Sequence, residues 1–321
     1  MMSVKWGYSL NAWDHEENSV RKDRNERTFK TISAAGFTGV ELIVGSGRWC
    51  PLGRPGNIKY IYGDADDFNR YLKKTVAIDQ LITWDYDPGA IAVEEDTLGR
   101  DPGDPAQHDG IVEATEKYVA FLAAVDSKFL VVRPMLSWWK VNPVTEEKIK
   151  KAADCWNKVG KMASSYGLKI LLRVDWMCAA NSMSAIDILM AETDQATVGL
   201  CINTGELTMV GIDPIALYRK YTSRTGLFQF KDVRVADTLE EYKQPFAEDI
   251  KKNGGARKVD RWFWEMGHNE KPGLVDFAGL MRAIRAAGYD GWIVVESDQS
   301  PDPAASVLYN SWYIQNVLNK I

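Results

Sequence analysis

Short apolar runs alternate with longer amphipathic stretches along the whole chain, and this alternation limits the fold more than any other feature. Most of the runs are apolar on both faces, which is typical of parallel strands buried beneath helices. We predict strands at residues 4–10, 39–44, 78–84, 129–135, 168–175, 198–203, 226–231 and 291–296. We predict helices near residues 26–35, 66–76, 109–125, 145–166, 184–192, 213–222, 240–252, 276–287 and 304–319.

Eight strands that are each followed by a helix are the pattern of a (β/α)8 TIM barrel, and we predict one such domain over residues 1–321. A doubly wound sheet is the alternative. However, the segment GYSLNAW at the first strand has one glycine and lacks the glycine-rich loop of a dinucleotide site. Long loops at 45–63 and 85–108 follow the second and third strands, on the catalytic face of a barrel. We expect each to be either a lid or an oligomer contact.

The charge balance excludes several classes of partner. The chain has 39 basic and 44 acidic residues and a net charge of -5, so it has no cationic surplus for nucleic acid or an anionic membrane. No apolar stretch reaches the roughly 18 residues of a membrane span, and the start does not resemble a secretory signal. The four cysteines are far apart and are typical of reduced, buried thiols. We therefore expect a cytoplasmic protein whose partner is a small-molecule substrate.

Polar side chains stand at the end of every predicted strand, where the active site of a barrel forms. A lone buried Glu or Arg is more often part of a structural ion pair, but polar groups at eight strand ends are hard to explain by packing. The ends carry Asn11, Trp13, Glu41, Trp84, Asp85, Arg133, Arg173, Asp175, Asn203, Glu206, Gln229, Lys231, Glu296 and Asp298. The chain has only three histidines, His15, His108 and His268, so any histidine-rich site must be built from these.

Four segments carry a resemblance to a known family. They are GFTGVEL at 36–42, VGLCINTGEL at 198–207, FQFKDVR at 228–234 and AGYDGWIVVESD at 287–298. In this order they resemble the xylose-isomerase-like sugar phosphate isomerase/epimerase family, with the inosose dehydratase and inosose isomerase branches most similar. The resemblance implies a TIM barrel that is often a dimer or tetramer. It also implies a divalent metal, held by Glu, Asp, His and Glu from the fifth to eighth strands, that polarises a carbonyl while carboxylates move a neighbouring proton.

Three of the four implied metal ligands are replaced in this sequence. The fifth-strand Glu falls on Arg173 in KILLRVDW, the Asp of a DTGH-like turn on Asn203 in NTGE, and the seventh-strand His on Gln229 in QFKD. Only the eighth-strand Glu is kept, as Glu296 in VVESD, while the His of the DTGH-like turn falls on Glu206. A guanidinium repels a metal ion and can take its place by donating hydrogen bonds to a carboxylate or an oxyanion. We therefore predict no metal cofactor at this position.

Other ligands leave an alternative open, in which the enzyme depends on a divalent metal such as Mn or Mg. The relocated ligands would come from Asp175, Glu206, Asp232, Glu296 and His268. A third hypothesis is a non-catalytic binding protein on the same scaffold.

The first hypothesis is an isomerase or lyase that moves a proton next to a carbonyl of a polyhydroxylated or ring-containing small molecule. Glu296 is the candidate general base or acid and Glu206 its counterpart. Arg173 is the candidate for stabilising an oxyanion, with Gln229 and Asn203 as donors. Candidate substrate-binding residues are Asn203, Lys231, Arg133, Glu41, Trp13, Trp84, Trp138, Trp176 and His268. The tryptophans favour a substrate with a flat or apolar part.

Overall fold

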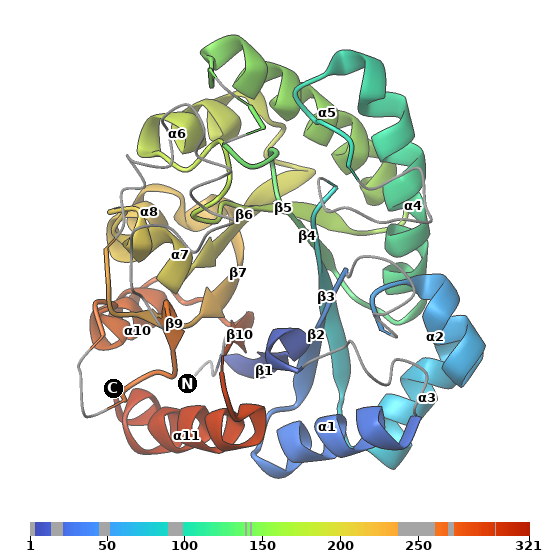
Figure 1. Cartoon of the computed structure of the whole chain (residues 1–321), viewed down its shortest axis with the longest axis vertical. Helices are drawn as coiled ribbons and strands as arrows, with labels where there is room; N and C mark the ends of the chain where they lie inside the picture. Colours follow the sequence, from blue (N-terminus) through green and yellow to red (C-terminus); the bar gives the residue numbers. More distant parts are fainter. Residues whose placement is uncertain are drawn as a thin grey trace.

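Eight parallel strands close into a barrel at the centre of the computed structural model, which describes residues 4–13, 22–44, 52–88, 99–138, 140–141, 143–236, 261–268, 273–298 and 300–321 (Figure 1). The strands are β1 (Lys5–Ser9), β2 (Gly39–Ile43), β3 (Gln80–Tyr86), β4 (Phe129–Val132), β5 (Lys169–Arg173), β6 (Val198–Asn203), β7 (Thr225–Phe230) and β10 (Trp292–Val295). The barrel closes because β1 pairs with β2 on one side and with β10 on the other. All eight predicted strands are thus confirmed, as is the TIM barrel.

Helices surround the barrel on all sides (Figure 1). They are α1 (Lys22–Ala34), α2 (Pro55–Tyr62), α3 (Ala65–Thr75), α4 (His108–Ala124), α5 (Glu146–Ser165), α6 (Met183–Glu192), α7 (Thr204–Met209), α8 (Pro214–Lys220), α10 (Phe277–Ala286) and α11 (Pro303–Asn316). The helix predicted near 240–252 lies outside the described residues. Part of the loop predicted at 45–63 is the helix α2, which begins with Pro55 in its first turn and buries Ile58 and Tyr62. This i, i+4 spacing places both side chains on one helical face.

Two short strands, β8 (Asp232–Val233) and β9 (Phe263–Trp264), pair antiparallel above the end of β7. They bring residues 261–268 back to the carboxyl end of the barrel, although some thirty residues of chain separate them from β7. This pairing was not predicted from the sequence, and it places an aromatic segment beside Lys231.

The apolar residues of the strands form two separate layers. Inside the barrel a small cluster consists of Ile82, Val131, Leu171, Cys201, Leu227 and Val294. The opposite faces of the strands join the helices in one large outer core. The interior cluster fills the barrel, so functional groups can lie only beyond it, toward the carboxyl ends of the strands.

The described part of the chain agrees with the other structural predictions. Cys155, Cys178 and Cys201 are free and buried, while Cys50 lies outside the described residues. Among the helices of the described residues, none is both long enough and apolar enough to cross a bilayer. His108 lies outside the candidate site, because it is buried at the start of α4, where its Nε2 lies 2.8 Å from the Pro102 carbonyl oxygen.

Candidate active site

A layer of polar side chains lies directly above the apolar filling of the barrel. Side chains of a strand alternate between its two faces, so the residue two positions after an inward-pointing residue also points inward. On β4, β5, β6, β7 and just after β10, the interior apolar residue is followed at this spacing by Arg133, Arg173, Asn203, Gln229 and Glu296. The alternation that builds the core therefore also aims these five polar side chains into the barrel.

Three carboxylates from distant parts of the chain meet in this layer. Glu41 on β2, Asp85 on β3 and Glu296 after β10 each offer an oxygen, and these oxygens lie within 4.8 Å of one another. We call them the three-carboxylate cluster. Within the described residues, it is the one group of three or more His, Cys, Asp and Glu side chains that is close enough to share a metal ion.

Arg173 links this cluster to a row of ion pairs. Its Nε donates to Asp85 Oδ1 at 3.0 Å, and its Nη1 lies 3.3 Å from Asp175 Oδ2. Arg133 continues the row by donating to Asp175 Oδ1 at 3.0 Å and to Asp87 Oδ2 at 3.1 Å. Arg133 is thus bound by two carboxylates, which makes it a support for Asp175, while Arg173 lies next to the cluster.

Two buried amides connect the carboxylates on opposite sides of the barrel. Asn203 Nδ2 donates to Glu296 Oε2 at 2.7 Å and to Gln229 Oε1 at 3.2 Å. Gln229 Nε2 in turn donates to Glu41 Oε2 at 2.8 Å. These linked hydrogen bonds fix the orientation of both Glu296 and Glu41. Gln229 and Glu41, which they join, are 188 positions apart in the sequence.

Lys231 brings Glu206 and Glu296 to one point. Its buried Nζ lies 2.7 Å from Glu206 Oε1, 3.3 Å from Glu296 Oε2 and 3.1 Å from Asp298 Oδ2. The ring of Phe263 lies 3.8 Å from the same ammonium. Glu206 is held in turn by the backbone N–H of Trp176, which donates to its Oε2 at 3.0 Å.

Burial and crowding of charge shift several pKa values. Burial, reinforced by the charges of Glu296 and Asp85, raises the pKa of Glu41 well above its usual value. Burial also raises the pKa of Asp85 to about 6, against the opposing effect of Arg173. The pKa of Glu206 rises to about 7 because burial outweighs the nearby Lys231. Burial disfavours the charged ammonium of Lys231, but Asp298, Glu206 and Glu296 more than compensate and raise its pKa. Lys231 therefore acts as a cation.

A family model described as the xylose isomerase-like TIM barrel matches residues 29–310. The chain belongs to this family. An inosose dehydratase from Lacticaseibacillus casei is 32% identical over 162 residues, which are 50% of each chain, so the matched part spans about half the length of this curated relative. Two solved structures share the fold. The probable 3-DHS dehydratase AsbF of Bacillus anthracis has a TM-score of 0.69 at 11% identity, over 98% of this chain and 100% of that one. An L-ribulose 3-epimerase has a TM-score of 0.68 at 15% identity, over 99% and 95%.

The metal position that the xylose isomerase-like family implies does not fit the residues present here. Arg173 occupies the fifth-strand position and is paired with Asp85 and Asp175. The amide nitrogens of Asn203 and Gln229 both donate to carboxylates, so these side chains orient acids at the remaining positions. The structure does contain the three-carboxylate cluster nearby, so the predicted independence from metal is not supported.

The alternative set of relocated ligands is not brought together. Asp232 accepts hydrogen bonds from the backbone N–H groups of Val233 and Val275, outside the barrel mouth. His268 packs its ring against Trp264 and Tyr309, with ring centroids 5.4 and 5.9 Å away. The alternative in which Asp232 and His268 serve as relocated metal ligands is therefore wrong. Glu296 belongs instead to the three-carboxylate cluster.

The predicted tryptophans separate into two sets. Trp176 lies beside Glu206 and packs against Trp262, with 5.8 Å between the ring centroids. Half-buried Trp13 follows the end of β1 and packs against Tyr8. Trp84 instead packs against α4 through Tyr118 and Phe121 and is fully buried. Trp138 is buried and lines a hollow of about 560 Å³ between α5 and α6. Trp176, Trp13 and Trp138 thus remain candidates for substrate contact, and Trp84 packs in the helical core.

The placement of Trp84 gives a first prediction. Trp84 Nε1 donates to the carbonyl of Leu52 at 2.9 Å. In Trp84→Phe this buried carbonyl loses its donor, so we expect the free energy of unfolding to fall by about 1–3 kcal/mol. Turnover per folded molecule should be unchanged. Urea unfolding and activity at equal folded concentration check both statements, and a selective loss of turnover would place Trp84 in the site after all.

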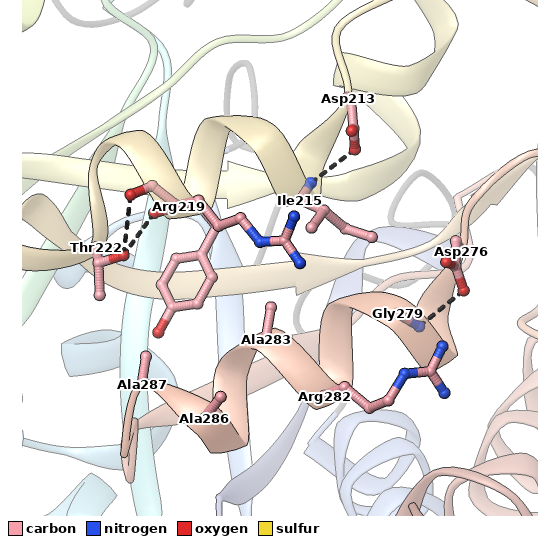
Figure 2. A pocket seen from close by; sticks show the side chains of 11 residues that line it. Asp213, Ile215, Arg219, Thr222, Asp276, Gly279, Arg282, Ala283, Ala286 and Ala287 are labelled. Carbon is pink, nitrogen blue, oxygen red and sulfur yellow. Dashed lines mark hydrogen bonds between the residues drawn. The ribbon is translucent and has the colours of Figure 1, made fainter.

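One hollow on the helical layer is separate from this site. Figure 2 shows it between α8 and α10, with a volume of about 750 Å³. The two carboxylates on its rim, Asp213 and Asp276, accept hydrogen bonds from the backbone N–H groups of Ile215 and Gly279 and cap the two helices. Their role is therefore explained by helix capping.

Proposed function

We propose that this protein is an isomerase or lyase that moves a proton next to the carbonyl of a polyhydroxylated small molecule, such as a cyclic or open-chain keto sugar. The observation that carries this proposal is the joint contact of Lys231 with Glu206 and Glu296. Two buried carboxyl groups at one point, one with a pKa near 7, suit the removal of a proton and its return. Relatives named as inosose dehydratase and L-ribulose 3-epimerase support both the reaction class and the substrate class.

In this proposal Glu296 takes the proton. Asn203 and Lys231 hold one of its oxygens, which fixes the direction of the carboxylate. Glu206 donates its own proton, either to the same carbon, to the neighbouring carbon or to a leaving hydroxyl. Its raised pKa keeps a large share of the group protonated near neutral pH, as a general acid requires.

Arg173 supplies a fixed positive charge at the strand position where the family places a metal ligand. Its guanidinium is nearly buried and is held by Asp85 and Asp175, so its direction is fixed before substrate binds. A preorganised donor of this kind stabilises the oxyanion that forms when a proton leaves the carbon beside a carbonyl. The proton transfer therefore needs no metal at the family position.

A substrate panel tests this function directly. An inosose, several ketohexoses and keto glucosides are incubated with the enzyme, and products are identified by NMR. An epimerised, isomerised or dehydrated product is expected for at least one of these compounds. Recovery of every compound unchanged, by a protein that binds one of them, would support the binding-protein hypothesis instead.

The raised pKa of Glu206 gives a second prediction, for the pH dependence. Because Glu206 acts in its protonated form, kcat/KM should fall as the pH rises above about 7, where the carboxyl loses its proton. In Glu206→Gln we expect this alkaline limb to disappear and the rate to drop by about 10²–10⁴. A pH profile of the wild type and the variant checks this. A rate that instead increases through pH 7 would show that Glu206 acts as the base.

A further inference from the structure

Glu41 is a buried acid without a cationic partner. It is fully buried on β2, and its Oε1 has no hydrogen-bond partner among the described residues. Its other oxygen accepts the neutral amide of Gln229, and the buried hydroxyl of Ser9 is the other neutral group that acts on this carboxyl. An ionised carboxylate in such a place is costly unless a counter-charge is added, so Glu41 must either bind a proton or face a cation that is not among the described residues.

The surrounding charges show the same imbalance. The polar layer and the groups bonded to it contain three cationic side chains, Arg133, Arg173 and Lys231. They face seven carboxylates, namely Glu41, Asp85, Asp87, Asp175, Glu206, Glu296 and Asp298. Each cation already contacts at least two of these carboxylates, and none contacts Glu41. Among the described residues, Glu41 is thus the one of these seven carboxylates that contacts no cation.

The three carboxylates are oriented as metal ligands usually are. One oxygen of each is fixed by an N–H donor: Glu41 by Gln229, Asp85 by Arg173 and Glu296 by Asn203. The second oxygen of Glu41 is buried and has no hydrogen-bond partner within the described part of the chain. Donors that hold the outer side of a ligand in this way are a regular feature of metal sites.

We propose that Glu41, Asp85 and Glu296 bind a divalent cation of the Mg²⁺ or Mn²⁺ class through their free oxygens. Three carboxylates with no His or Cys among them suit a hard cation that completes its shell with water or substrate oxygens. This site differs from the family position, because two of its ligands come from β2 and β3. Arg173 stays compatible with it, since the guanidinium binds the Asp85 oxygen that the cation does not use.

The inference does not depend on the proposed reaction, and a cation bound to the free oxygen of Glu296 would compete with the proton that this carboxylate takes there. Glu206 lies outside the cluster and would remain free to be protonated.

Binding of Mn²⁺, followed by electron paramagnetic resonance, tests the site without any turnover. The wild type should bind about one Mn²⁺ per chain, and Mg²⁺ should compete. In Glu41→Gln and in Asp85→Asn the affinity should fall by at least about tenfold, because each removes one ligand. Glu206→Gln is the matched control, since it neutralises a buried Glu of the same mouth outside the cluster, and its affinity should stay within about threefold.

Glu41→Gln keeps a carbonyl oxygen for the bond from Gln229 and removes an unpaired charge, so the metal-free variant should be at least as stable as the wild type. Thermal unfolding checks this, and added Mn²⁺ should stabilise the wild type but not the variant.

The proposal is overturned if the wild type binds no Mn²⁺ at millimolar concentrations, which would mean that protons neutralise the cluster. Equal binding by the wild type and Glu41→Gln would overturn it as well. Because no substrate is present, either result is separate from the test of the reaction.

Discussion

Replacement of Arg173 by Met is expected to abolish measurable turnover and to lower the free energy of unfolding by about 3–5 kcal/mol. The change leaves two buried carboxylates, Asp85 and Asp175, without the guanidinium that now contacts both. Breaking a buried ion pair from one side costs this much because the remaining charge stays buried without compensation. The same change removes the donor that we assign to the oxyanion. Denaturant unfolding and single-turnover rates at saturating substrate measure the two effects separately.

Two further variants show which property of Arg173 matters. Arg173→Lys keeps the charge but loses the planar fork that reaches two carboxylates, so it should recover part of the stability and little of the rate. Arg219→Met removes an arginine on the outer helix α8 and should change neither. Wild-type turnover in Arg173→Met would contradict the role of Arg173 in the reaction, whatever happens to stability.

Replacement of Glu296 by Gln should lower kcat by about 10²–10⁴ while the fold is retained. Gln has nearly the same volume as Glu, and its amide oxygen can still accept the bond from Asn203 Nδ2. The variant therefore loses the proton acceptor but little packing. Circular dichroism with thermal unfolding verifies the fold, and kcat at saturating substrate verifies the loss.

A matched control for Glu296→Gln is Asp232→Asn. Asp232 is a buried carboxyl one residue after Lys231, but its oxygen accepts backbone N–H groups of Val233 and Val275 outside the cluster. An asparagine oxygen can accept the same bonds, so kcat should stay within a few-fold of the wild type. A comparable loss in both variants would show that any buried charge matters at this end of the barrel, and Glu296 would no longer be distinguished as the base.

The strands and the polar layer could be predicted from the sequence because both follow from local periodicity. Short apolar runs that alternate with longer amphipathic stretches are typical of buried strands. The family resemblance then located Arg173, Asn203, Gln229 and Glu296 correctly at strand ends, and the structure brings these four together with Glu41 and Lys231.

The directions of the Trp84 and Asp85 side chains were harder to predict, because an irregularity in the strand exchanges the two faces of β3. Counting by two from the inward residue Ile82 predicts that Trp84 points inward and Asp85 outward. The pairing of β2 with β3 shifts by one residue between Val40 and Glu41, which inserts an extra residue into β3. A shift of one residue exchanges the two faces of a strand. Trp84 therefore enters the helical core and Asp85 enters the site.

The remaining contacts of the site that could not be predicted from the sequence depend on pairing between distant parts of the chain. Phe263 and Trp262 reach Lys231 and Trp176 only through the pairing of β8 with β9. The aromatic run RWFWEMG at 261–267 was the available signal, but nothing local indicates which part of the barrel it covers. The approach of Glu41 to Gln229 depends likewise on closure of the whole barrel.

Incorporation of solvent deuterium tests the proposed proton transfer most directly. The enzyme is incubated in D₂O with the keto compound that it converts, and the substrate and product are followed by NMR. In the wild type we expect solvent deuterium at the carbon next to the carbonyl in an epimerised or isomerised product, and loss of the proton from this carbon in a dehydrated one. In Glu296→Gln the rate of this proton removal should be lower by about 10²–10⁴. An epimerised or isomerised product without deuterium at this carbon, a dehydrated product that keeps the original proton there, or proton removal at the wild-type rate in Glu296→Gln, would contradict proton transfer by this site.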